Sequence, residues 1–174
     1  MLQTLGEGLW IVEGPTVSFF GDWVAHYPSA QLRGAPGLKK KRPDLSFFAE
    51  LGGEPRPRWQ GAIEFVMVGG SFAMDEAVFF HRPSKTALVC DLIQNHDPNA
   101  FSRWKRRLMK LDGLRGSDGS TPREWRATFI DRKTARAALQ TILDWNPEQL
   151  ILAHGPVFRQ SARDIIASSL QWMT

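Results

Sequence analysis

Residues 76–92 read EAVFFHRPSKTALVCDL, and this stretch decides the fold. Two runs of strand-forming residues, 76–81 and 86–92, flank the four residues Arg82-Pro83-Ser84-Lys85, which have the composition of a turn. We therefore expect an antiparallel hairpin. Its second strand delivers a carboxylate, Asp91, at the point where the apolar run ends.

Further elements are expected on both sides of this hairpin. Upstream, the pattern predicts strands at 8–13, 30–33 and 62–68, a helix at 23–27, a helical turn leading from 35–38 into 39–42, and an irregular excursion over 43–59. Downstream, it predicts a strand at 149–153 and three helices that begin at the capping residues Asp97, Asp131 and Ser161. Asp164 would complete a capping box with Ser161. Because helices and strands alternate, the fold class should be α/β.

The composition is that of an ordinary globular protein. A chain of 174 residues suits one domain over 1–174, and its net charge of +4 is too small to indicate a nucleic-acid partner. The single cysteine, Cys90, excludes an internal disulfide and a Cys-based zinc knuckle, and within an apolar strand it should behave as a small hydrophobe. No apolar run is long enough to span a membrane and no signal sequence is visible, so the expected location is the cytoplasm.

A polar residue follows an apolar strand at two places. Asp91 comes after ALVC, and His154 comes after the run QLILA at 149–153. Strand ends that open into loops are where α/β sheets place their sites, and a carboxylate and an imidazole from two strands are ordinary metal ligands. Gly155 would leave the backbone beside His154 open to a metal or a ligand. The sequence contains no Gly-x-Ser-x-Gly, phosphate-binding glycine loop or dinucleotide motif.

These residues resemble a family. The stretches 79–86, 88–92 and 152–155 are similar to a metallo-β-lactamase-like family of unknown function. The resemblance extends over nearly the whole chain through shorter matches: Leu9-Trp10, Glu13-Gly14-Pro15, Trp23 to Pro28, Ala30, residues 35–38 and residues 41–44. It implies an αββα sandwich with a divalent-metal site, such as zinc, along one edge. By motif match, the implied metal ligands are Asp91 and His154.

The chain departs from the family in two ways. The segment that carries the main His motif is missing between about residues 20 and 22, so the N-terminal sheet of the sandwich should be incomplete. The second ligand motif should precede Ala77, where the chain has no histidine; Asp75 or Glu76 could substitute, although this pair is more typical of a strand start. His96 is the best candidate for a third ligand, ahead of His26 and His81. At best two of the usual ligands remain.

Two functions are compatible with this reading. One is a metal-dependent hydrolase with a degenerate site, in which a metal-bound hydroxide would attack an ester-like or amide-like bond of an unidentified small molecule. The other is a non-catalytic interaction protein that keeps the scaffold. A third, weaker alternative is a nucleic-acid or anion-binding module, based on two basic runs: Lys39 to Arg42, and Arg103, Lys105, Arg106, Arg107 and Lys110. Since deleted strands leave open sheet edges, we also expect a homo-oligomer.

Overall fold

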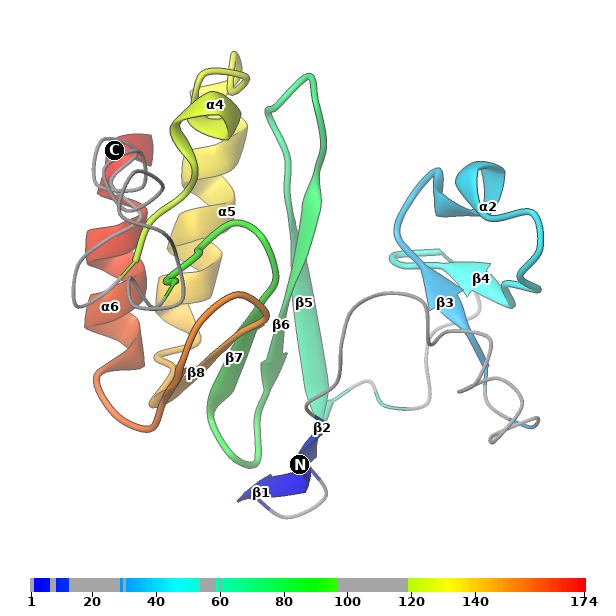
Figure 1. Ribbon diagram of the computed structural model, residues 1–174, viewed down its shortest axis with the longest axis horizontal. Helices are drawn as coiled ribbons and strands as arrows, with labels where there is room; N and C mark the ends of the chain where they lie inside the picture. The colour runs from blue at the N-terminus through cyan, green and yellow to red at the C-terminus, as the bar shows by residue number, and fades with distance from the viewer. Residues whose placement is uncertain are drawn as a thin grey trace. The chain divides into compact units, whose positions relative to one another are not determined.

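The computed structural model describes residues 2–6, 9–12, 29, 31–53, 59, 61–96 and 119–174 (Figure 1). The chain divides into two compact units, residues 1–60 and residues 61–174, which are described separately below. The sequence prediction of one domain over 1–174 stays a prediction. Among the described residues, no helix combines the length and the apolar character that crossing a membrane requires.

The first unit contains short elements. Strands β1 (Leu2–Gly6) and β2 (Leu9–Val12) form an antiparallel pair, which confirms the predicted strand at 8–13 and adds one that was not predicted. Strands β3 (Arg33–Gly34) and β4 (Ala49–Glu50) are parallel and only two residues long. Between them, helix α2 (Leu38–Lys41) confirms the predicted helical turn.

The second unit is built on a five-stranded sheet in the order β5-β6-β7-β8-β9. The strands are β5 (Ile63–Val68), β6 (Glu76–His81), β7 (Thr86–Val89), β8 (Gln149–Leu152) and β9 (Val157–Phe158). β6 and β7 pair antiparallel across the turn at 82–85, so the predicted hairpin is confirmed. β7 and β8 pair parallel, and the sheet is therefore mixed.

Helices cover one face of this sheet (Figure 1). Helix α5 (Arg132–Asp144) packs on β5, and helix α6 (Ala162–Ser169) packs on β8 and on α5; helix α4 (Arg123–Arg126) and the 3-10 helix η2 (Gln171–Met173) complete the layer. The side chain of Asp131 caps α5 by accepting a hydrogen bond from the Thr134 amide, as predicted. The predicted core stripe of α5 is confirmed, because Ala135, Ala138, Leu139 and Ile142 are buried and Leu143 packs against them.

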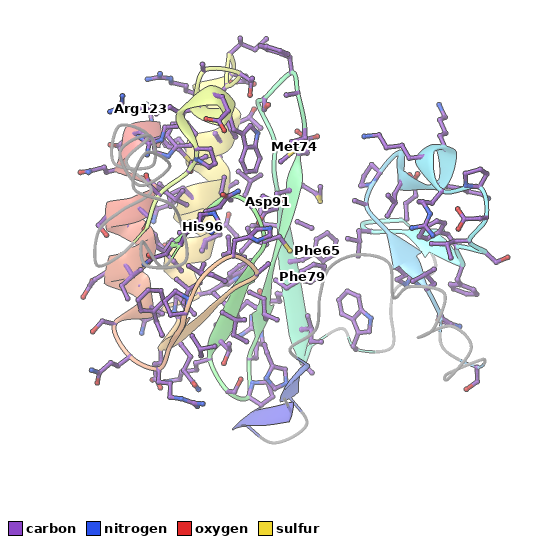
Figure 2. All side chains as sticks on the ribbon, viewed as in Figure 1. Phe65, Met74, Phe79, Asp91, His96 and Arg123 are labelled. Carbon is purple, nitrogen blue, oxygen red and sulfur yellow. The ribbon has the colours of Figure 1, made fainter. Side chains whose placement is uncertain are left out.

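The other face of the sheet carries an apolar row. The strand registers align one residue from each strand, and all five are half-buried: Phe65, Phe79, Leu88, Ile151 and Val157. The rings of Phe65 and Phe79 lie side by side with centroids 5.9 Å apart (Figure 2). The second unit is therefore a mixed α/β structure with helices on one face of the sheet. The αββα sandwich with an incomplete N-terminal sheet and the homo-oligomer stay predictions.

Two local predictions are wrong. Ser161 precedes α6, but its φ of 57° is left-handed and its side chain makes no capping hydrogen bond, so the capping box does not form. Cys90 was expected inside a strand, yet β7 ends at Val89 and Cys90 is exposed, because the chain leaves the sheet there to meet the side chain of Glu76. Sequence patterning also missed α4 and β9, which are too short to show a period. The predicted helix that begins at Asp97 lies outside the described residues.

Candidate functional site

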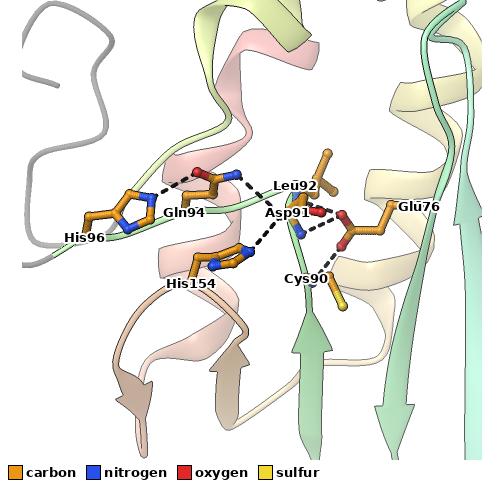
Figure 3. A network of polar contacts seen from close by, with 7 residues as sticks. All are labelled: Glu76, Cys90, Asp91, Leu92, Gln94, His96 and His154. Carbon is orange, nitrogen blue, oxygen red and sulfur yellow. Dashed lines mark hydrogen bonds and ion pairs between the residues drawn. The ribbon is translucent and has the colours of Figure 1, made fainter. Parts of the chain in front are cut away.

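The two predicted strand-end residues meet. Because β7 and β8 are parallel and in register from Thr86–Gln149 to Val89–Leu152, their carboxyl ends lie at the same edge of the sheet. Asp91 and His154 each follow two residues after their strands, and Asp91 Oδ1 lies 3.0 Å from His154 Nε2 (Figure 3). Both side chains remain accessible, with 43% and 41% of their surface exposed. A carboxylate accepts and does not donate, so His154 Nε2 carries the proton of this contact.

The backbone around His154 is held by the neighbouring strand and loop. The Ala153 amide donates to the carbonyl of Val89, and the Asn95 amide donates to the carbonyl of His154 at 2.8 Å. A Cβ on Gly155 would lie 2.9 Å from Leu152 Cδ1 and 3.1 Å from the Asn95 oxygen. The space beside Gly155 is therefore occupied by the chain itself. The absence of a side chain at Gly155 allows the loop that carries Asn95 to pack closely. The sequence had predicted that this space would be open to a metal or a ligand.

Gln94 connects His96 to the pair. Its amide Nε2 lies 3.5 Å from Asp91 Oδ1, and its Oε1 lies 3.0 Å from His96 Nε2 (Figure 3). Since the amide oxygen can only accept, His96 Nε2 donates to it. Partial burial, followed by the charge of His154, lowers the pKa of His96. The rings of His96 and His154 are 6.0 Å apart between centroids, so the predicted third ligand lies beside the pair and bonds it through Gln94.

Glu76 is the residue whose role the sequence did not reveal. It begins β6, as predicted, and is only 7% exposed. Its Oε1 accepts the amide proton of Cys90 at 2.8 Å, and its Oε2 accepts those of Asp91 at 2.8 Å and Leu92 at 2.7 Å (Figure 3). Burial raises the pKa of Glu76, and the three amide bonds oppose that rise. Both oxygens are engaged by backbone, so Glu76 does not replace the missing histidine ligand.

Cys90 is not an activated nucleophile. Desolvation of its thiol, together with the charges of Glu76 and Asp91, raises the pKa of Cys90 to about 11. The nucleophile and the metal ligand are the thiolate form, which is scarce at neutral pH when the pKa is this high.

The remaining predicted candidates lie elsewhere. His81 is buried, and its Nδ1 bonds the hydroxyl of Ser84 at 2.8 Å, which in turn bonds Thr86 at 2.7 Å; these contacts tie together the β6–β7 hairpin. His26 and the basic run at 103–110 are outside the part of the chain that the structure describes. In the first unit, Lys39, Lys40 and Lys41 are exposed on α2.

The family resemblance implies a divalent metal, so the site should contain enough side-chain ligands to hold one. Within the described ranges, no group of three or more His, Cys, Asp or Glu side chains is placed to hold one metal ion. A catalytic zinc ordinarily has three protein ligands. Asp91 and His154 therefore suit a weakly held divalent ion, and by themselves they do not form a complete catalytic zinc site.

Comparison with known proteins gives little further support. No protein-family profile matches the sequence, and no curated protein matches it at a significant level. Among solved structures, a crystal structure of the DIM-1 metallo-β-lactamase exposed to ceftazidime aligns with 88% of this chain and 61% of its own chain, at 17% identity and a TM-score of 0.49. The protein thus spans less than two thirds of that lactamase chain. Family membership is not established by a likeness at this level.

Proposed function

We propose that the Asp91–His154 pair is a weak divalent-metal site on a metallo-hydrolase-like scaffold. The observation that carries this proposal is the 3.0 Å approach of Asp91 Oδ1 to His154 Nε2, from the ends of two adjacent parallel strands. A carboxylate and an imidazole that converge on an accessible edge are a donor combination suited to zinc and similar divalent ions. The motif resemblance described above names the same two residues.

Metal binding there has a defined proton balance. His154 Nε2 donates to Asp91 in the metal-free protein, so an ion that binds this nitrogen must displace the proton. A neutral imidazole holds one proton, which can move to Nδ1, so metal binding at Nε2 requires the Nδ1–H tautomer of His154 and releases no proton from the neutral ring. The chemistry that a divalent ion supplies when bound is polarisation of a carbonyl, which suits ester-like or amide-like substrates.

The experiment is a titration of the purified, metal-stripped protein with Co²⁺ and with Zn²⁺, followed by calorimetry and by the visible absorption of cobalt. We expect one weakly bound ion per chain, and we expect its loss in Asp91→Asn and His154→Ala. Asp164→Asn is the matched control, because Asp164 is an exposed carboxylate on α6 in the same unit. Absence of binding in the wild type, or equal binding in His154→Ala, would refute the proposal.

Catalysis is tested separately. Metal-loaded protein would be assayed on generic ester, β-lactam, phosphodiester and thioester substrates. Turnover that disappears in His154→Ala and persists in Asp164→Asn supports hydrolase activity. Turnover that survives His154→Ala would place the reaction at another site or in a contaminant.

A second candidate function is a non-catalytic interaction protein in which the cluster is structural. It is favoured by the hydrogen bonds of the two imidazoles, because the Nε2 atoms of His154 and His96 both donate to side-chain oxygens, as in a metal-free polar network. This candidate predicts that His154→Ala lowers stability and changes neither metal content nor turnover. Metal binding lost in that variant would exclude it.

A further inference from the structure

We infer that Glu76 is the positioning residue of this site: its buried carboxylate holds three consecutive backbone amides and thereby aims Asp91 at His154. The inference rests on the proposed function for its relevance to metal binding. The positioning itself is a property of the fold and is testable without metal.

The first step is the loss of sheet hydrogen bonds at the end of β7. β6 and β7 pair through Phe79–Leu88, Phe80–Ala87 and His81–Thr86. If this pairing continued in the same register, Glu76 would lie opposite Asp91. The described pairing stops at Phe79–Leu88. The backbone amides beyond β7 therefore need another acceptor, since buried N–H groups are rarely left unpaired.

The second step is that one side chain supplies this acceptor. The amides of Cys90, Asp91 and Leu92 all donate to the two oxygens of Glu76, at 2.7 to 2.8 Å. Hydrogen bonds to an ionised acceptor are shorter and stronger than neutral ones. The carboxylate thus replaces the missing rungs of the sheet and fixes the direction in which the chain leaves β7.

The third step separates Asp91 from its neighbours. Leu92 and Ile93 are anchored independently, because both side chains are fully buried and Thr121 Oγ1 donates to the Leu92 carbonyl at 2.6 Å. The His154 backbone is held through Asn95. In contrast, Cys90 is exposed and Asp91 is half-buried, and both lie between the end of β7 and the buried residues Leu92 and Ile93. Removing the Glu76 acceptor should therefore move Asp91 relative to His154 while the flanking segments stay in place.

The test compares two Glu→Gln substitutions on neighbouring strands. Glu76→Gln keeps the size of the side chain but sets an amide donor against the backbone amides. Glu64→Gln, the control, removes the same charge from β5, where Glu64 is paired with exposed Arg82 and has no described contact with residues 90–92. Crystal structures of both variants and of the wild type, without metal, give the first readout.

We expect the Asp91 Oδ1–His154 Nε2 separation to exceed about 3.5 Å, the limit of a hydrogen bond, in Glu76→Gln only. We also expect Co²⁺ to bind Glu76→Gln about 10- to 100-fold more weakly than the wild type, the usual effect of losing a residue that orients a ligand. Glu64→Gln should match the wild type in both readouts. Glu76→Asp, which keeps the charge on a shorter side chain, should bind Co²⁺ with intermediate affinity.

An unchanged Asp91–His154 separation in Glu76→Gln would overturn the inference, whatever the metal result. If the wild type binds no Co²⁺, the proposed function fails, and the crystallographic comparison still decides the role of Glu76. If Glu76→Gln does not fold, Glu76→Asp provides the same comparison. Should Glu64→Gln weaken Co²⁺ binding as much as Glu76→Gln, charge loss would explain the effect and positioning would be rejected.

Discussion

Two glycines with nearly the same positive φ provide a sharp test of the packing in the second unit. Gly70 has φ of +98° and Gly61 has φ of +96°. A Cβ on Gly70 would lie 2.2 Å from the carbonyl oxygen of Asp131 and 3.2 Å from its carbonyl carbon, whereas a Cβ on Gly61 would meet no described atom within 4 Å. The two sites thus differ in steric space and share a positive φ, which strains any residue with a Cβ.

The magnitudes follow from these two terms. An alanine held at a positive φ costs about 1–3 kcal/mol at either site. At Gly70 the clash is with backbone, which cannot rotate away, so overpacking adds about 1–3 kcal/mol. Gly70→Ala should therefore destabilise the protein by about 1–3 kcal/mol more than Gly61→Ala, a further fall in Tm of about 2–4 °C per kcal/mol for a chain of this length.

The assay is urea unfolding of both variants and the wild type, followed by circular dichroism, with the slope m compared to confirm that the unfolded states are equivalent. Equal losses in the two variants would mean that the backbone strain accounts for the whole effect. Such a result would refute the close approach of Gly70 to Asp131. The hydrogen bonds from the Ile130 and Asp131 amides to the Gly70 carbonyl, both 3.0 Å, would then also be in doubt.

Two further predictions concern stability. Thr121→Val removes the buried hydroxyl that donates to the Leu92 carbonyl, so we expect a loss of about 1–3 kcal/mol in urea unfolding. Thr141→Val, at an exposed position, should change the free energy of unfolding by no more than about 0.5 kcal/mol. Equal losses in the two variants would contradict a stabilising role for the Thr121–Leu92 hydrogen bond. Asp131→Ala removes the cap of α5. Hydrogen bonds from Thr134 lower the pKa of Asp131, so its contribution is present above the ordinary value of 3.8 and is lost as the pH falls through the lowered value. The difference in stability between this variant and the wild type, measured by urea unfolding at several pH values, should shrink on acidification; a constant difference would disprove the linkage.

Elements with a clear local period were predictable from the sequence. The hairpin of β6 and β7 follows from two apolar runs around a Pro-containing turn, and the buried stripe of α5 follows from its helical spacing. The cap at Asp131 was predictable because its carboxylate and the Thr134 amide that it caps are only three residues apart in the sequence. Ser161 also belongs to the residue types that commonly cap helices, but the sequence contains no sign that its φ is left-handed.

The interactions of the candidate site were predictable only in part. Asp91 and His154 were recognisable because each polar residue directly follows an apolar run. Their proximity results from the parallel pairing of β7 and β8, which the sequence did not reveal. Glu76 was recognised only as the start of a strand. Its three partners are amides, and an amide is present at every non-proline residue, so no side-chain pattern marks the residues that it binds.

By itself, the sequence determined the longer strands and helices of the second unit and the polar residues that follow two of its strands, because apolar periodicity is a local property of the chain. Only the tertiary structure decided that β7 and β8 are parallel neighbours and that Asp91 lies 3.0 Å from His154. It also decided that Glu76 accepts a hydrogen bond from the Asp91 amide, just beyond the end of β7. These contacts depend on strand register and on where the ladder of backbone hydrogen bonds ends. Both are set by how distant segments pack, and neither leaves a mark on the local pattern of residues.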